Sequence, residues 1–390
     1  MIKFRKKKAD KNIDKKSDVK QHNEHKIEIV NVNKIYDMGR ESLHVLKDIN
    51  FTVDEGEFVA ILGPSGSGKS TLMNVIGCMD LFDEGEYYLD GLAIHSMKEK
   101  KLTSIRNEKI GFIFQNYHLI PTYTVIQNVI MPLLMRGYEH EEAQEMCMDT
   151  IEMLGLKERI NHKPNELSGG QKQRVSLAGV MVDQVKILLF DEPLANLDPA
   201  TGKQTIELID EIQEKTDTTV VIIEHRLEDV LWRNVDRIIL MKDGGILADL
   251  HPDELLSTGL LGENGIREPL YLTAMRYAGV DILPEKKPSH VDSVIINESD
   301  RTKIHNWFHA QPTAEKEAEK TPLLEVKNLS FGYTKDHQTL RNVSLSIGKG
   351  EMVSIVGKNG AGKSTFSKLV CGFETPDSGE ILFDGRDLLQ

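Results

Sequence analysis

A motif for phosphate binding occurs twice in this chain, and this repeat constrains the fold more than any other feature. Gly63–Ser70 has the sequence GPSGSGKS and Gly357–Ser364 has GKNGAGKS, so both fit G-x-x-x-x-G-K-[ST]. The glycines of this motif let successive backbone N–H groups turn inward around a chain of phosphates. Chance places one such pattern in roughly one chain of this length in a hundred, and two far more rarely. The sequence therefore predicts two loops that bind phosphate groups.

The repeat extends beyond the loops. Val45–Ile94 aligns without gaps on Thr339–Leu388. Apolar runs at 57–62 and 351–356 precede the two loops and are predicted to be strands, and helix-like segments follow both loops. A junction between a strand and a helix is the context that the motif requires. We expect an internal repeat whose second copy stops where its sheet begins.

Composition limits the class of protein. With 390 residues, of which 39% are apolar, the chain is long enough for two or three domains with buried cores. Its net charge of −13 argues against nucleic acid as a partner, although the first 26 residues form a basic arm that we expect to be disordered. Cys78, Cys147 and Cys371 lack metal-ligand spacing, which indicates reduced thiols in the cytosol. Because no apolar run approaches the roughly 20 residues that cross a bilayer, we expect any membrane span to belong to another chain.

A third glycine-containing element lies between the loops. Leu167–Gln171 has the sequence LSGGQ, and a good helix sequence follows it. Two glycines and a hydroxyl at a helix N-terminus favour an anion, because the first N–H groups have no partner inside the helix and the helix dipole is positive there. This element alone would usually be an ordinary loop, but beside two phosphate loops it indicates a further contact to phosphate.

Predicted strands also present polar side chains at their carboxyl ends, where parallel sheets bind ligands. Asp191 and Glu192 follow the apolar run Ile187–Phe190, so that Asp191 can hold magnesium and Glu192 can polarise a water for attack on a γ-phosphate. His225 ends another apolar strand and is interpreted as a contact to the γ-phosphate. Gln115, at a third strand end, is predicted to bridge metal, water and a moving segment.

Taken in this order, the motifs resemble those of the ATP-binding cassette (ABC) family. The resemblance covers residues 27–250 completely and 323–390 in part. It implies ATP and Mg²⁺ as ligands, held in head-to-tail dimers between the phosphate loop of one domain and the LSGGQ loop of the other. It also implies that Tyr36 and its counterpart Tyr333 stack on adenine.

The candidate site residues fall into three groups. The predicted catalytic residues are Glu192, His225, Gln115 and Lys69, and the predicted metal ligands are Ser70, Gln115 and Asp191. The predicted nucleotide-binding residues of the first copy and the LSGGQ loop are Tyr36, Gly63, Pro64, Ser65, Gly66, Ser67, Gly68, Lys69, Ser70, Thr71, Ser168, Gly169, Gly170 and Gln171. Those of the second copy are Tyr333, Gly357, Gly360, Gly362, Lys363, Ser364 and Thr365.

The predicted fold is an α/β P-loop NTPase of the ABC type, with a mostly parallel core sheet, an antiparallel β portion, a helical subdomain and a partial second copy. The expected domains are a basic arm (1–26), a complete ATPase domain (27–250), a linker with a short helical segment (251–322) and a truncated second domain (323–390). The helical subdomain is expected around 116–166, and the helical segment of the linker at 268–280. We expect this linker to be a plain tether, with regulatory contact between the copies as the alternative.

Two finer resemblances divide the chain. Through residues 39–80 and 112–137, the N-terminal half resembles the ATPases of lipoprotein release and macrolide export. From Arg174 onward the sequence resembles the duplicated ATPases of energy-coupling-factor importers, especially those for thiamine precursors. The two resemblances therefore imply a mosaic, which a gene fusion, a recombination product or an assembly error would each explain.

The function expected from these features is ATP hydrolysis that energises solute transport through a separate membrane permease, with the protein cytoplasmic and peripheral on the inner face of the membrane. The permease comes from other chains, and the partner ATPase is a second copy or another ABC ATPase. We expect the second loop to bind nucleotide weakly without hydrolysis, and the first cassette to need a second chain for hydrolysis. A soluble tandem ATPase that acts on ribosomes and an inactive mosaic fragment are the alternatives.

Overall fold

The computed structural model describes residues 25–39, 41–182, 185–195, 197–311, 321–334 and 337–388. Nearly all of the basic arm predicted at 1–26 lies outside these ranges. Most of 310–322, whose sequence AQPTAEKEAEKTP predicts exposed linker, also lies outside them. The same holds for Asn196, the first residue of Asn196–Asp198, which the sequence predicts to be a short connecting loop between paired nucleotide sites.

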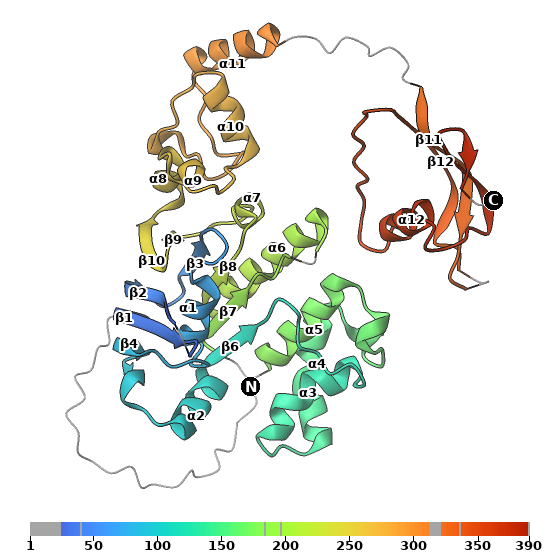
Figure 1. Cartoon of the computed structure of the whole chain (residues 1–390). Helices are drawn as coiled ribbons and strands as arrows, with labels where there is room; N and C mark the ends of the chain where they lie inside the picture. Colours follow the sequence, from blue (N-terminus) through green and yellow to red (C-terminus); the bar gives the residue numbers. More distant parts are fainter. Residues whose placement is uncertain are drawn as a thin grey trace, which may run out of the picture.

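A six-stranded sheet with the order β10-β9-β3-β8-β7-β6 forms the centre of the first cassette (Figure 1). Its strands are β3 (Phe58–Leu62), β6 (Ile110–Ile113), β7 (Ile187–Asp191), β8 (Thr219–Ile223), β9 (Arg237–Lys242) and β10 (Gly245–Leu250). Neighbours from β9 to β6 are parallel, and only β10 pairs in the antiparallel sense, with β9. The mostly parallel core sheet predicted from the sequence is confirmed.

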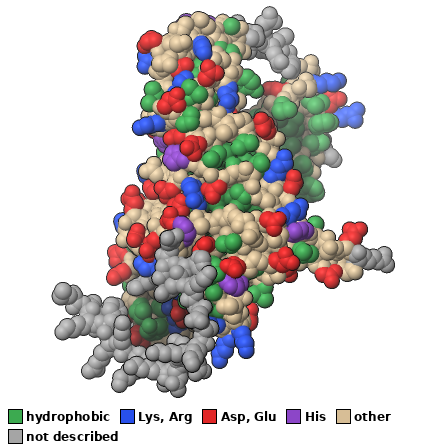
Figure 2. Space-filling model, turned by 90° about the vertical axis from the view of Figure 1, so that its left-hand side faces the viewer, with side chains coloured by type: hydrophobic (Ala, Val, Ile, Leu, Met, Phe, Trp, Pro, Cys, Tyr) green, Lys and Arg blue, Asp and Glu red, His purple; other side chains and the backbone are tan. Residues whose placement is uncertain are grey.

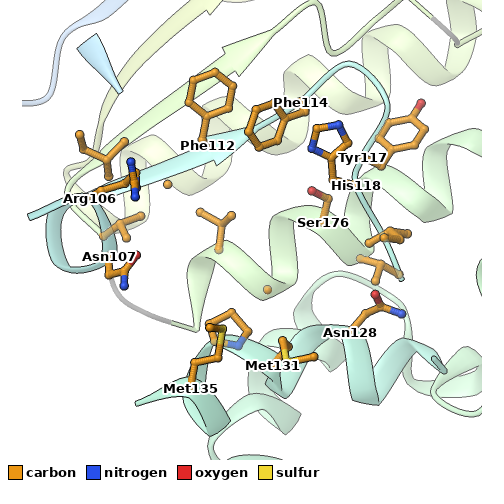
Figure 3. A pocket seen from close by; sticks show the side chains of 18 of the residues that line it. Arg106, Asn107, Phe112, Phe114, Tyr117, His118, Asn128, Met131, Met135 and Ser176 are labelled. Carbon is orange, nitrogen blue, oxygen red and sulfur yellow. The ribbon is translucent and has the colours of Figure 1, made fainter. Parts of the chain in front are cut away.

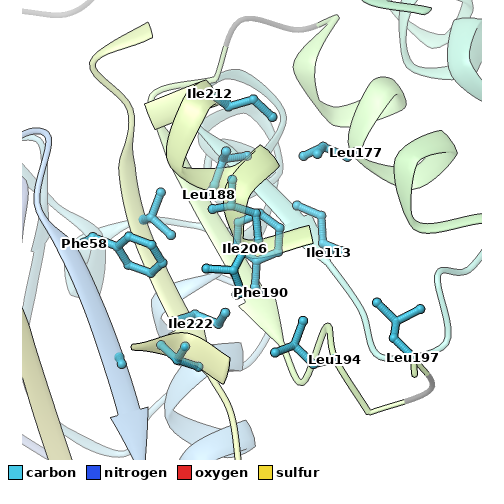
Figure 4. Packing of buried hydrophobic residues seen from close by; sticks show 14 of the residues in the cluster. Phe58, Ile113, Leu177, Leu188, Phe190, Leu194, Leu197, Ile206, Ile212 and Ile222 are labelled. Atoms are coloured by element: carbon cyan, nitrogen blue, oxygen red, sulfur yellow. The ribbon is translucent and has the colours of Figure 1, made fainter. Parts of the chain in front are cut away.

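Both faces of this sheet are buried, which explains why its strands are continuous apolar runs. On one face Phe58, Leu188 and Phe190 belong to the same cluster as Ile206 and Ile212 of the helix α6 (Pro199–Thr216) (Figure 4). Side chains at alternate positions, such as Ile61 and Leu189, belong to a second cluster on the other face. Successive side chains of a strand point to opposite faces, so each strand contributes to both clusters. Packing on both faces holds the strands, and therefore their carboxyl ends, in place.

The second cluster also contains residues of the predicted antiparallel β portion. This sheet has the order β2-β1-β4-β5. Its strands are β1 (Ile27–Asp37), β2 (Ser42–Val53), β4 (Glu84–Leu89) and β5 (Leu92–Ala93). The helix α1 (Lys69–Ile76), the short turn η1 (Ile94–Ser96) and α2 (Glu99–Lys109) complete this part of the cassette.

The predicted helical subdomain is also present. It consists of α3 (Val125–Met135), α4 (His140–Met153) and the short turns η2 (Lys157–Arg159) and η3 (Pro164–Glu166), and α5 (Gly169–Met181) follows directly. Thr124 caps α3 in a reciprocal capping box with Gln127, which fixes where the helix begins. Helices α3, α4 and α5 pack on one another through apolar residues such as Val129, Cys147 and Val175.

The segment after β10 is more ordered than the linker that the sequence predicted. It contains α8 (Pro252–Ser257), α9 (Leu260–Glu263), α10 (Leu270–Tyr277), η4 (Pro284–Lys286) and α11 (Glu298–Ala310). The helix α10 agrees with the helical segment expected at 268–280. The Pro and Lys residues of DILPEKKPSH (281–290) are typical of an exposed linker, but Ile282 within it is buried in the same cluster as Leu255 and Leu272. We call residues 251–311 the connector module.

The second copy forms its own small sheet with the order β12-β11-β13-β14. Its elements are β11 (Pro322–Phe331), β12 (Leu340–Gly348), α12 (Lys363–Val370), β13 (Ser378–Phe383) and β14 (Arg386–Asp387). The strand predicted at 351–356 is not formed, and Met352 is 98% exposed. The prediction was wrong because a strand needs partners: β3 lies between β8 and β9, whereas no described residue of the second copy pairs with 351–356.

Candidate functional site

The first phosphate loop has the shape that its glycines allow. Gly63, Gly66 and Gly68 have φ values of 155°, 80° and 99°, which residues other than glycine rarely adopt. A Cβ atom on Gly63 would lie 2.4 Å from the carbonyl oxygen of Met241 on β9. A side chain at position 63 would therefore collide with β9, and glycine allows the loop to lie close to that strand. The loop joins the carboxyl end of β3 to the beginning of α1.

Two polar side chains of this loop are buried. Lys69 is only 5% exposed, and its Nζ donates to the carbonyl oxygens of Gly63 at 2.8 Å and Pro64 at 3.0 Å. Burial lowers the pKa of Lys69, and the nearby carboxylates of Glu192 and Asp191 oppose that shift. Ser67 Oγ is buried and makes no hydrogen bond to the described residues. A buried polar atom of this kind favours a bound group that supplies its partner.

Asp191 ends β7 beside the first residues of α1. Ser70 Oγ donates to Asp191 Oδ1 at 3.5 Å, so the hydroxyl and the carboxylate face the same space. Burial raises the pKa of Asp191, and the negative charge of Glu192 raises it further. A cation placed between Ser70 and Asp191 would relieve this repulsion.

Glu192 lies between the two other predicted strand-end residues. Its Oε1 is 2.9 Å from His225 Nε2, and its Oε2 accepts a hydrogen bond from Gln115 Nε2 at 3.2 Å. The backbone of Glu192 has φ 50°, a conformation that costs free energy and is concentrated at functional sites. The structure thus brings together the ends of β6, β7 and β8, as the sequence predicted.

Glu224 supports this arrangement and was missed by the sequence analysis as a site residue. Its buried carboxylate accepts hydrogen bonds from the backbone N–H groups of Leu194 at 2.6 Å and His225 at 3.0 Å. Burial raises the pKa of Glu224. The carboxylate thus joins the segment after β7 to the segment after β8. The signal for this role in the sequence was an acidic residue directly before His225.

The LSGGQ loop forms the N-terminus of α5. Ser168 is the N-cap, and the Gln171 N–H donates to its Oγ at 3.3 Å, while Ser168 N–H donates to Gln171 Oε1 at 2.9 Å. A Cβ atom on Gly170 would lie 2.6 Å from Thr201 Cγ2 on α6. The glycine therefore allows α5 and α6 to approach closely at this end.

The second phosphate loop faces this element. The N–H of Asn359, within the loop, donates to Asp198 Oδ2 at 3.5 Å. A cavity of about 440 Å³ lies between Asn359 and the residues Pro164, Gly169 and Lys172 around the start of α5. The loop of one copy therefore lies opposite the LSGGQ element of the other.

The two tyrosines predicted to stack on adenine have different surroundings. The Tyr36 hydroxyl donates to Asp80 Oδ2 at 2.5 Å, and Lys34 Nζ lies 4.9 Å from its ring centroid. Burial raises the pKa of Tyr36. Tyr333 is exposed and makes an edge contact with Phe331, with ring centroids 4.9 Å apart. Adenine stacking by either ring remains a prediction.

A separate groove lies beside the helical subdomain (Figure 3). It has a volume of about 480 Å³. The rings of Phe112 and Phe114 lie 4.3 Å apart, and His118 follows Phe114 at 4.2 Å, so the three rings form one wall. Met131 and Met135 of α3 line the opposite side.

Within the ranges that the structure describes, no helix combines the length and the apolar character needed to cross a membrane. The same residues also include no group of three or more His, Cys, Asp or Glu side chains placed to hold a metal ion.

Known protein families match most of this chain. A family described as "ABC transporter" matches residues 46–195 and 340–390, and one described as "ATP-binding cassette cobalt transporter" matches 258–331. An ABC transporter ATP-binding protein of Clostridium perfringens is 44% identical over 89% of this chain and 61% of its own length. A protein of the same description from Enterococcus faecalis is 46% identical over the same shares. The chain therefore spans about 61% of the length of these relatives.

Solved structures agree with these matches. The dimeric bacterial ABC transporter cassette MJ0796 is 40% identical, with a TM-score of 0.54, and the match covers 58% of this chain and 98% of that one. The same cassette is also known in a post-hydrolysis state bound to ADP and phosphate. The cbiO1 protein of Clostridium perfringens, part of the ABC transporter complex cbiONQ, is 27% identical with a TM-score of 0.56 and matches over 65% of this chain and 99% of its own.

The family match covers more than half of the chain, and the fold and the strand-end residues agree with it. This chain therefore belongs to the ABC transporter family of ATP-binding proteins.

Proposed function

We propose that this protein hydrolyses ATP to drive the movement of a solute through a separate membrane permease. The observation that supports this most directly is the position of Glu192, whose carboxylate is held between Gln115 and His225 beside the phosphate loop. A carboxylate fixed in this way can orient a water for in-line attack on a terminal phosphate.

Each residue of the first site has a distinct role in this reaction. Lys69 exchanges its two carbonyl partners for phosphate oxygens and neutralises their charge. His225 contacts the γ-phosphate and holds the Glu192 carboxylate. Gln115 contacts the same carboxylate from the segment that leads into the helical subdomain, so a movement of that subdomain changes the position of the attacking water.

The donor atoms at Ser70 and Asp191 fit Mg²⁺. Both are oxygens that lie 3.5 Å apart. Burial and the negative charge of Glu192 raise the pKa of Asp191, and a cation bound between the two oxygens would oppose that shift. Mg²⁺ is usually bound by one or two protein oxygens together with substrate phosphates, and Ser70 and Asp191 would supply the protein oxygens. When bound, Mg²⁺ neutralises charge that develops on the phosphates.

The groove beside the helical subdomain is the proposed docking site for the permease. Its aromatic wall and the side chains of Met131 and Met135 suit an apolar helix, and methionine adapts its shape to different partners. The wall belongs to the segment that contains Gln115, which contacts Glu192. Binding of a helix in this groove would thus affect the position of Gln115.

The proposed partners also include a second ATPase. The phosphate loop of the first cassette needs an LSGGQ element opposite it, and we propose that another copy of the chain or a related ABC ATPase supplies it. We propose that the second loop, which faces α5 of its own chain, binds nucleotide weakly without hydrolysis. The protein is then peripheral at the inner face of the membrane, where its permease lies.

Charge distribution supports a protein partner over nucleic acid. On the face shown in Figure 2, acidic side chains are interspersed with basic ones instead of leaving a continuous basic band. The net charge of −13 agrees with this distribution.

The finer resemblances extend the proposal. The match of residues 258–331 to the family described as "ATP-binding cassette cobalt transporter" supports the importer resemblance for the C-terminal part. For the N-terminal half we retain the resemblance to the ATPases of lipoprotein release and macrolide export. A gene fusion between the two types explains both.

The test is the ATPase rate of the purified chain across a series of protein concentrations, with the Glu192→Gln variant alongside. Loss of a positioned general base costs about 10²- to 10⁴-fold in rate, whereas ATP binding should persist. Glu211→Gln, in an exposed ion pair with Lys215, is the matched control and should keep the full rate. The rate per chain should rise with concentration if two chains must pair.

Either of two results would contradict the proposal: an undiminished rate in Glu192→Gln, or no hydrolysis from folded wild-type protein that binds ATP when its permease is present. A rate per chain that does not depend on protein concentration would contradict only the part of the proposal that requires two chains to pair.

A further inference from the structure

The connector module contacts the segment that follows His225. This segment consists of Arg226, the single-turn helix α7 (Leu227–Val230), Leu231 and Trp232. Only Arg226 separates His225 from α7, so a displacement of α7 moves the imidazole that holds Glu192. Hydrogen bonds weaken over a few tenths of an ångström, so such a displacement would weaken the contact between His225 and Glu192.

The first cassette holds one side of this segment through Trp232. The indole Nε1–H of Trp232 donates to Glu207 Oε1 on α6 at 2.9 Å, and Lys203 Nζ lies 3.7 Å from the centroid of the same ring. Both partners belong to α6, which begins directly after Asp198, the residue that contacts the second phosphate loop. The tryptophan thus links α6 to the segment after His225.

The connector module holds the other side. The backbone N–H of Leu270 donates to Glu228 Oε2 on α7 at 3.4 Å, and the His290 ring lies 5.8 Å from the ring of Trp232. Residues of both contacts line a cavity of about 280 Å³. The buried side chains of Leu227 and Val230 belong to the same apolar cluster as Leu255 and Leu272 of the module.

An ion pair and hydrogen bonds join the parts of the module that make these contacts. Arg276 of α10 pairs with Glu268 at 3.1 Å and donates to the carbonyl oxygens of Leu256 and Thr258. The Tyr271 hydroxyl donates to the carbonyl oxygen of Pro288 at 2.5 Å, which joins α10 to the loop that carries His290. Leu270 and His290 are therefore presented to α7 from one framework.

We propose that the connector module positions His225 for hydrolysis by holding α7 through Glu228 and Trp232, so that it regulates the ATPase site instead of serving as a tether. This inference rests on the proposed function. Glu228 and Trp232 are positioning residues, since they act through the backbone of the segment 226–232, which contains α7. Because such coupling is reciprocal, nucleotide binding at the first cassette changes the contact between Trp232 and the module.

The first test removes one contact without removing a side chain of the active site. Leu270 is the first residue of α10, where proline is tolerated, so Leu270→Pro deletes the N–H that donates to Glu228. In the full-length chain this variant should lower kcat by about two- to tenfold, the effect of one net hydrogen bond, and leave KM for ATP unchanged. Leu270→Ala keeps the N–H and should keep the wild-type kcat.

A second pair of variants tests the acceptor. Glu228→Ala should have the kcat of Leu270→Pro, whereas Glu228→Gln keeps an acceptor oxygen and should restore most of the rate. Glu285→Ala, at an exposed position of the same module, is the control for removal of a carboxylate and should have no effect. Far-UV circular dichroism checks that all variants are folded.

The second readout is the fluorescence of Trp232. The chain has two tryptophans, so Trp307→Phe leaves Trp232 as the single reporter. Titration with ATP and Mg²⁺ should change its emission over the concentration range that saturates the ATPase, and the further substitution Glu228→Ala should abolish most of that change.

Unchanged kcat in both Leu270→Pro and Glu228→Ala would overturn the inference and leave the proposed ATPase function intact. If the wild-type chain hydrolyses no ATP, the proposed function fails. The emission of Trp232 then tests whether the connector module is coupled to the nucleotide site. A nucleotide-dependent change would support contact between the site and the module, and constant emission would overturn it.

Discussion

The two phosphate loops of this chain have nearly the same backbone, but the segments that precede them differ completely. Gly63 and Gly357 both have φ 155°, and Lys69 and Lys363 each donate to the carbonyl oxygen of the glycine that begins the loop, at 2.8 and 2.6 Å. In the first copy β3 is fully buried between β8 and β9, whereas 351–356 forms no strand and is exposed.

This difference separates local from tertiary determinants of structure. The loop is fixed by its glycines, by the lysine and by the helix that follows, all within about ten residues, so it forms in both copies. A strand inside a parallel sheet obtains its hydrogen bonds from distant segments, and similar apolar sequence does not form it without them. Motif geometry is thus not evidence that a complete nucleotide site surrounds the motif.

The largest expected difference between the copies concerns the two lysines. Lys69→Ala should reduce kcat by about 10²- to 10³-fold, because Lys69 lies beside Asp191 and Glu192 and neutralises phosphate charge at the site of hydrolysis. Lys363→Ala should leave at least half of the wild-type rate. Steady-state ATPase assays of both variants measure this difference.

If Lys363→Ala also lost most of the activity, the second loop would contribute to hydrolysis and the distinction between the copies would be wrong. ATP binding measured by calorimetry adds detail, since we expect Lys363→Ala to remove only a weak second binding event.

The next largest effect concerns stability. Ile61 and Ile355 occupy equivalent positions, but Ile61 is fully buried in β3 and Ile355 is 45% exposed. Ile61→Asp places an uncompensated charge in the core and should cost at least about 4 kcal/mol of the free energy of unfolding. Ile355→Asp should change that free energy by no more than about 1 kcal/mol. Urea unfolding of both variants, followed by circular dichroism, measures the contrast.

A large loss of stability in Ile355→Asp would contradict the exposed conformation of 351–356. Ile61→Val, which keeps an apolar side chain, is the control for β3 and should cost about 1 kcal/mol.

Much of the first cassette could be predicted because its signals are local or periodic. The apolar runs ending in Asp191, His225 and Gln115 identified parallel strands, and the rule that ligands bind at the carboxyl ends of such strands placed these side chains together. The hydrogen bonds of Glu192 to His225 and Gln115 agree with that expectation.

Two features could not be predicted, for the same physical reason. The connector module is held by contacts between residues distant in sequence, such as Arg276 with the carbonyl oxygen of Leu256, and the proline and lysine content of its loops concealed this packing. Glu224 was missed because its role depends on the backbone N–H of Leu194, which lies in the segment after β7, whereas Glu224 follows β8. Residue patterns within a segment carry no information on such partners.

The smallest expected effect distinguishes the copies by the reactivity of their cysteines. Cys78 follows α1 and Cys371 follows α12, but Cys78 is buried and Cys371 is exposed. Burial raises the pKa of the Cys78 thiol to about 12 and that of Cys147 to about 11, so both remain protonated at pH 8 and react slowly, since the thiolate is the nucleophile. Iodoacetamide at pH 8 should therefore modify Cys371 first, with peptide mass spectrometry as the measurement. If Cys78 of the folded chain were modified as fast as Cys371, the end of α1 would open as readily as the end of α12. The two copies would then not differ in packing at this position.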